Sequence, residues 1–114
     1  MLGLSSNLRY FLCCTPIDIR NGFDGLAGIV RNTLQNDPIS GSIFIFLNKK
    51  RTHVKILYWD GDGFALFYKR LERGKYPLTT HNNPSKELKR EELFMLLEGL
   101  SFDKIRKGKR YKIT

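Results

Sequence analysis

The sequence predicts an α+β fold: a small antiparallel β-meander of three to four strands packed against one main helix, then a short C-terminal helix and a basic tail. Three apolar segments, residues 42–47, 53–59 and 64–71, follow one another across short polar turns. An apolar stripe with helical spacing precedes them. With 114 residues, 41% of them hydrophobic, the chain is expected to form one globular domain over residues 1–103, with residues 104–114 as a flexible tail.

The first strand is predicted over residues 8–14, which are aromatic and apolar and run into Thr15 and Pro16. Thr15, Pro16 and Asp18 also fit the N-cap, the first-position proline and the third-position acid of a helix. A helical turn that begins at Thr15 is therefore an open alternative.

The main helix is predicted from a stripe of apolar residues with a helical period. They recur at spacings of i, i+3, i+4, i+7 and i+11: Phe23, Leu26, Ala27, Val30 and Leu34. The helix should end before Pro38, because the residue that precedes a proline is driven away from helical geometry.

Two short turns, residues 48–52 and 60–63, should join the strands of the meander as hairpins. Along the middle strand, side chains alternate between the two faces of the sheet. One face carries His53, Lys55, Leu57 and Trp59, and the other carries Val54, Ile56 and Tyr58. One face of the sheet is expected to pack against the main helix.

The chain beyond the third strand predicts a loop and a second helix. Gly74 and Pro77 should end the strand, and residues 79–85 have the composition of a surface loop. The second helix is predicted over residues 90–98, with leucines on its apolar side and Gly99 as its C-terminal stop.

The charge balance points to a polyanionic partner. The chain carries 20 Lys and Arg against 11 Asp and Glu, for a net charge of +9 and a pI near 9.8. Residues 1–48 hold three basic and three acidic residues, so all of the excess lies beyond them. Cations that cluster in this way predict contacts with nucleic-acid phosphates, although a solvated surface is the alternative. The sequence leaves DNA and RNA equally open.

The candidate nucleic-acid-binding residues come from the meander and the tail. Those of the meander are Lys49, Lys50, Arg51, Lys55, Lys69, Arg70, Arg73 and Lys75, and those of the tail are Lys104, Arg106, Lys107, Lys109 and Arg110. The turn over residues 48–52 lies at the end of the sheet where the third strand finishes. All of the meander cations except Lys55 are therefore expected to gather at one edge of the molecule.

Other groups predict structure rather than chemistry. Asp18 and Asp24 bracket Arg20, and we interpret these residues as a structural corner between the first strand and the helix; a divalent-cation site is the alternative. The adjacent Cys13 and Cys14 predict reduced thiols that serve packing. We predict no metal site, no cofactor and no catalytic residue.

Four aromatic residues of the meander are open to two interpretations. Bases could stack on exposed rings, whereas rings in a sheet opposite a helix more often belong to the core, which we favour. They are Trp59, Phe64, Phe67 and Tyr68.

No apolar run reaches the roughly 20 residues that a membrane span requires. The N-terminus also lacks the pattern of a secretory signal. A cytoplasmic protein without membrane contact is therefore expected.

Several segments together resemble a known family. Residues 15–26, 37–44, 48–51, 55–64 and 66–72 are similar to TnpB, the accessory protein encoded by the second open reading frame of the insertion sequence 66 family of bacterial transposable elements. The resemblance runs from about residue 10 to residue 100. It implies a non-catalytic accessory protein for DNA transposition, which acts beside a larger transposase and another accessory protein of the same element.

Two hypotheses follow for how such a protein acts. The first is DNA binding through phosphate contacts with little readout of bases. The second is an adaptor that docks onto the transposase or the other accessory protein, through exposed sheet positions or the leucine-rich final helix, without touching DNA. The oligomeric state is left open by the sequence.

Overall fold

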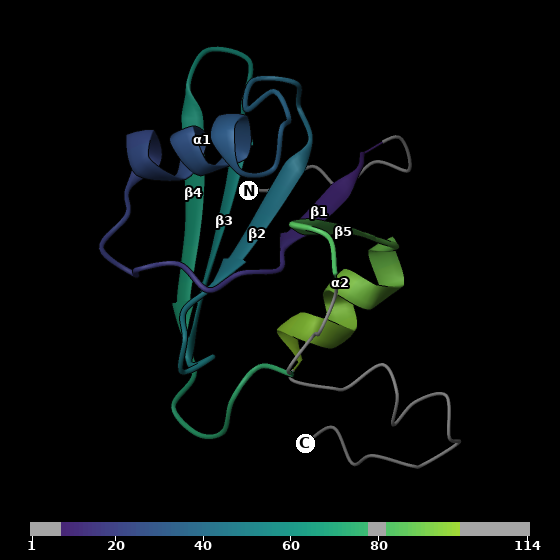
Figure 1. Cartoon of the computed structure of the whole chain (residues 1–114). Helices are drawn as coiled ribbons and strands as arrows, with labels where there is room; N and C mark the ends of the chain where they lie inside the picture. Colours follow the sequence, from purple (N-terminus) through teal and green to yellow (C-terminus); the bar gives the residue numbers. More distant parts are fainter. Residues whose placement is uncertain (1–7, 78–81, 99–114) are drawn as a thin grey trace.

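The computed structural model describes residues 8–77 and 82–98, which form a five-stranded sheet with a helix on each face (Figure 1). The elements in chain order are β1 (Tyr10–Cys13), α1 (Phe23–Asn32), β2 (Ile43–Leu47), β3 (His53–Trp59), β4 (Phe64–Arg70), β5 (Ser85–Leu88) and α2 (Arg90–Leu97). The strand order across the sheet is β4-β3-β2-β1-β5. The α+β class and both helices are therefore confirmed.

The predicted meander is present, but it is only part of the sheet. β2, β3 and β4 pair antiparallel through two hairpins, and Gly61 in the second turn has a positive φ of 86°. β1 lies parallel to β2, so α1 is the crossover between them. β5 pairs antiparallel with β1 at the far edge. The prediction of three to four antiparallel strands was therefore wrong in two ways: the sheet has five strands, and β1 is parallel to β2. β5 was missed because it is short and polar and is held by backbone pairing rather than by an apolar pattern.

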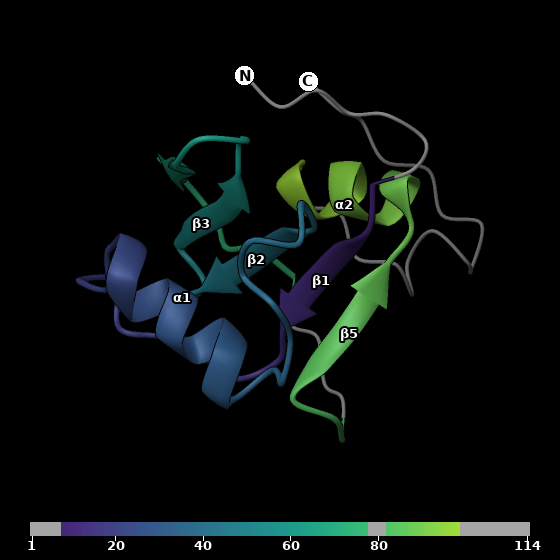
Figure 2. The same cartoon turned by 90° about the horizontal axis from the view of Figure 1, so that it is seen from above.

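Both faces of the central strands are buried, rather than the single face that was expected. α1 packs on one face, where Leu26 and Val30 contact the core around Phe44. α2 packs on the opposite face, where Leu93 and Leu96 contact the core around Ile45 (Figure 2). All five residues of β2 are buried, as a strand covered on both sides requires. Within the described residues, no helix has the length and hydropathy to cross a membrane.

The segment between β1 and α1 runs along the end of β2. Ile17 forms a parallel bridge with Asn48, and its backbone N–H donates to the Leu47 carbonyl at 2.9 Å. The alternative of a helical turn from Thr15 is thus wrong, since this segment pairs with the sheet. α1 begins only after Gly22, and Phe23 at its first position is 47% exposed, outside the apolar stripe to which it was assigned.

Candidate nucleic-acid interface

The β2–β3 turn is built around the side chain of Asn48. Its Oδ1 accepts the backbone N–H groups of Thr52 at 2.9 Å and His53 at 3.0 Å. Its Nδ2 donates to Thr52 Oγ1 at 3.1 Å. The Arg51 N–H closes the turn by donating to the Asn48 carbonyl at 3.0 Å. A single carboxamide therefore fixes the loop that carries Lys49 and Lys50.

Arg51 ties this turn to the chain beyond β4. Its backbone is left-handed, with a φ of 58°, a region that ordinarily favours glycine. Its carbonyl accepts the Tyr76 N–H at 2.7 Å, and its guanidinium donates to the Tyr76 carbonyl at 3.2 Å. The Leu71 N–H also donates to the Thr52 carbonyl at 2.9 Å. Residues 71–77 are thus held against the turn.

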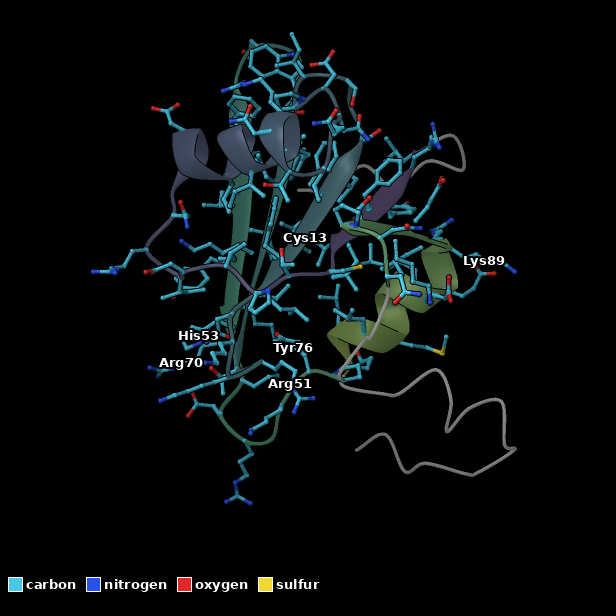
Figure 3. All side chains as sticks on the ribbon, in the orientation of Figure 1. Cys13, Arg51, His53, Arg70, Tyr76 and Lys89 are labelled. Carbon is cyan, nitrogen blue, oxygen red and sulfur yellow. The ribbon has the colours of Figure 1, made fainter. Side chains whose placement is uncertain are left out.

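The strand register places the end of β4 beside the β2–β3 turn. His53 pairs with Arg70, and Val54 pairs with Lys69. Arg51, His53, Arg70 and Tyr76 all lie at one end of β3 and β4 in Figure 3, whereas Lys89 lies well apart beside α2. We call this region the basic end of the sheet; its cations are Lys49, Lys50, Arg51, Lys69, Arg70, Arg73 and Lys75. The register places Lys69 and Arg70 at the end of the sheet where the β2–β3 turn lies.

Among the described residues, the cations of the basic end form one ion pair, between Arg70 and Glu72. All are exposed except Arg51, which is half-buried. Glu72 is the single carboxylate between residues 64 and 77. Its Oε2 lies 3.6 Å from the Arg70 Nη2, and the two side chains are 87% and 67% exposed. An ion pair this long and this solvated contributes little, so phosphate could replace Glu72 as the partner of Arg70.

An open hollow lies on the α1 side of the basic end. It is lined by Ile19, Asn48, Lys49, Lys50, Thr52, His53, Arg70 and Leu71. Three of these residues are cations, and they come from two separate segments of chain. The hollow is therefore an accessible concave surface with positive charge around it, suited to an anionic chain.

Lys55 does not belong to this surface, and its prediction as a nucleic-acid-binding residue was wrong. It is 6% exposed, and its ammonium donates to the carbonyls of Ile19 at 2.6 Å and Asn21 at 2.7 Å. The charge thus holds the segment before α1 against β3. It shares the α1 face of β3 with Leu57, and there the carbonyls of the segment before α1 bind its ammonium.

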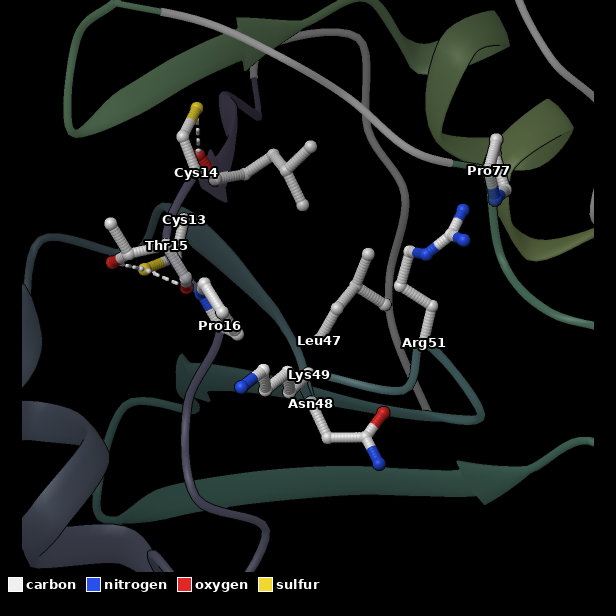
Figure 4. A pocket seen from close by; sticks show the side chains of 10 residues that line it. Cys13, Cys14, Thr15, Pro16, Leu47, Asn48, Lys49, Arg51 and Pro77 are labelled. Carbon is white, nitrogen blue, oxygen red and sulfur yellow. Dashed lines mark hydrogen bonds between the residues drawn. The ribbon is translucent and has the colours of Figure 1, made fainter.

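A second pocket, of about 90 Å³, lies between the end of β1 and the β2–β3 turn (Figure 4). Its wall includes both cysteines, which are free thiols. The Cys13 thiol donates to the Thr15 carbonyl at 3.3 Å, and the Cys14 thiol to the Leu12 carbonyl at 3.7 Å. Burial raises the pKa of Cys14, so its reactive thiolate is disfavoured. These contacts agree with a packing role for the cysteines.

Asp18 and Arg20 form an ion pair in the segment between β1 and α1. The Arg20 side chain donates to the Asp18 carboxylate at 2.7 Å, and the Arg20 backbone N–H donates to it at 2.9 Å. These hydrogen bonds lower the pKa of Asp18 to about 2. Asp24 lies instead in the first turn of α1, where the helix dipole favours a negative charge. In the described part of the chain, no three Asp, Glu, His or Cys residues come together as a metal site would require.

The aromatic residues of the meander divide into two groups. Trp59 and Phe64 are half-buried and pack edge to face, with ring centroids 5.1 Å apart. Phe67 and Tyr68 are 42% and 53% exposed, so their interpretation as core residues was wrong. β4 is an edge strand that the helices leave partly uncovered, a property that the alternation of residues does not reveal.

Some predicted residues fall outside the described part of the chain. They are the tail cations Lys104, Arg106, Lys107, Lys109 and Arg110. The boundary between a domain over residues 1–103 and a tail over residues 104–114 likewise stays a prediction.

The fold and the basic end define a small basic α+β protein, and comparisons with known proteins identify its family. The model of the IS66 Orf2-like protein family matches residues 8–107. The chain is 34% identical over 107 residues to the uncharacterized protein y4jC of Sinorhizobium fredii (strain NBRC 101917 / NGR234), covering 94% of this chain and 92% of that protein. It is 30% identical over 102 residues to the uncharacterized protein y4hO of the same strain, covering 90% and 89%. No solved structure matches the chain significantly.

The chain therefore belongs to the IS66 Orf2-like family, as the sequence motifs indicated. This membership supports an accessory role in the transposition of an insertion sequence.

Proposed function

We propose that the protein is a non-catalytic accessory factor for transposition that binds DNA through phosphate contacts at the basic end of the sheet. The observation that carries the proposal is the convergence of cations from the β2–β3 turn, the end of β4 and residues 71–77. The turn is held by Asn48 and Arg51, so the positive charges are gathered before DNA arrives. Release of counterions from the phosphates then supplies the binding free energy.

The proposal is tested by titrating a labelled DNA duplex of about 20 base pairs at about 50 and 200 mM salt. If the basic end engages on the order of six phosphates, the logarithm of the affinity should fall with a slope near −5 against the logarithm of the salt concentration. Fluorescence anisotropy measures both affinities. Binding that is absent at the lower concentration, or indifferent to salt, would overturn the proposal.

The adaptor hypothesis needs exposed apolar side chains for docking, and α2 exposes fewer of them than the leucine-rich sequence predicted. Leu93 and Leu96 of α2 are fully buried against the sheet, so Phe94 is the one large apolar side chain that α2 exposes among the described residues. The others exposed there are Phe23, Ile39, Phe67 and Tyr68. An adaptor should co-purify with the transposase after nuclease treatment and at high salt. A DNA-binding factor should lose the transposase under both conditions.

Arg51 offers a test that separates binding from folding. Replacing Arg51 by Gly removes the cost of a left-handed arginine and also removes the hydrogen bond to the Tyr76 carbonyl. These effects oppose one another, so the free energy of unfolding should change by less than about 1 kcal/mol. The affinity for the duplex should fall about 8-fold, the share of one phosphate contact at about 0.1 M salt.

Arg51→Lys is the matched control, because it keeps the charge at the same backbone position. It should bind the duplex within about 2-fold of the unmodified protein. Urea denaturation and anisotropy of both variants give the two quantities. Equal losses of affinity in both variants would assign the effect to the geometry of the turn rather than to charge.

A further inference from the structure

Four side chains form a compact array on the α1 face of the sheet, next to the basic end. His53 lies opposite Arg70 in the register, and Lys55 lies opposite Tyr68. Residues two apart on one strand point to the same face, so all four side chains project from that face. α1 crosses the upper part of β4 and β3 and does not reach this end of the sheet (Figure 1).

The ring of Tyr68 is the exposed centre of the array. The residue is 53% exposed, and the buried Lys55 ammonium lies 4.7 Å from its ring centroid. The His53 ring stacks beside it at 5.8 Å, with an angle of 29° between the planes. Lys55 is itself fixed by two backbone carbonyls. Lys55 and His53 thus pack against the Tyr68 ring, and about half of the residue remains exposed to solvent.

Positive charge adjoins this ring. Arg70 follows two positions along the same strand, and with Lys49 and Lys50 it lines the open hollow whose wall also includes His53. An aromatic surface beside a cationic groove is the combination by which proteins hold single-stranded nucleic acid, since bases stack on the ring while phosphates follow the cations.

We propose that this array binds single-stranded nucleic acid, with one base stacked on Tyr68 and the neighbouring phosphates at Lys49, Lys50 and Arg70. The inference rests on the proposed function and adds the form of the ligand. In a duplex the bases are stacked on one another and paired, so a ring that lies on a sheet does not reach their faces. A strand opened at the end of an element, or a transcript, presents bases that can stack.

The test compares Tyr68→Ala with Phe67→Ala. Phe67 is also exposed, but it is the residue before Tyr68 in β4, so its side chain points to the opposite face of the sheet. The probes are oligothymidine and oligouridine of about 12 nucleotides, which distinguish DNA from RNA, and a DNA duplex of the same length. Urea denaturation confirms that each variant is folded, and Tyr68→Leu replaces Tyr68→Ala if the smaller side chain prevents folding.

We expect Tyr68→Ala to weaken binding of the single strands roughly 10- to 100-fold and to leave duplex binding unchanged within about 2-fold. Phe67→Ala should leave all three affinities unchanged, and Tyr68→Phe should bind like the unmodified protein. Single-strand binding that survives Tyr68→Ala, or falls equally in Phe67→Ala, would overturn the inference while the phosphate-binding proposal stands. If no probe binds at low salt, the proposed function itself fails.

Discussion

Replacing Lys49, Lys50 and Arg70 together by glutamine is expected to weaken binding to duplex DNA by about two to three orders of magnitude at about 0.1 M salt. Each phosphate contact contributes about 0.9 to the salt slope, which corresponds to about 8-fold in affinity at that concentration. Loss of three contacts therefore also lowers the slope by about 2.7. The two readouts are linked, because both report the number of counterions released.

This effect should not arise from unfolding. All three side chains are exposed, and the ion pair of Arg70 with Glu72 is long and solvated. Their substitution should change the free energy of unfolding by less than about 0.5 kcal/mol. Anisotropy over a range of salt concentrations, with urea denaturation of the same samples, measures both quantities.

The control removes the same number of charges elsewhere, with Arg31, Lys89 and Arg90 replaced by glutamine. Arg31 is in the last turn of α1, whereas Lys89 and Arg90 lie at the start of α2. Figure 3 shows Lys89 away from the basic end. This variant has the same net charge as the triple variant of the basic end. It should retain most of the affinity and the slope, because it leaves the cations of the basic end in place. If both variants lose affinity alike, DNA responds to the overall charge of the protein, and the basic end has no special role.

The elements with a strong apolar period were predictable from the sequence, and so was their local pairing. The apolar stripe of α1 and the two hairpins are patterns among residues close together in the chain. The predicted bounds of β3, His53–Trp59, are therefore the bounds observed. The pairing of β1 with β2 and β5 depends on contacts between residues far apart in the chain. β5, with the sequence Ser-Lys-Glu-Leu, carries no local signal for this pairing.

The candidate site was partly predictable for the same reason. Turn position and strand register follow from hairpin geometry, so the gathering of Lys49 with Arg70 could be expected from sequence. The burial of Lys55 could not be derived from charge, because it depends on carbonyls contributed by the segment before α1. The exposure of Tyr68 likewise depends on where α1 stops short across the sheet.

Lys55→Met is expected to lower the free energy of unfolding by about 2 to 4 kcal/mol, with the melting temperature about 10 °C lower or more. Methionine keeps most of the apolar stem but leaves the Ile19 and Asn21 carbonyls without the ammonium that now binds both. The segment that leads into α1 thereby loses its attachment to β3. Urea denaturation followed by circular dichroism measures the loss.

Lys69→Met is the matched control on the neighbouring strand, because Lys69 is exposed at the end of β4. It should cost less than about 0.5 kcal/mol in stability. The order should reverse for duplex DNA: Lys69→Met should weaken binding by about 8-fold, and folded Lys55→Met should bind like the unmodified protein. An unfolding free energy of Lys55→Met within about 0.5 kcal/mol of the unmodified protein would contradict a structural role for the buried ammonium.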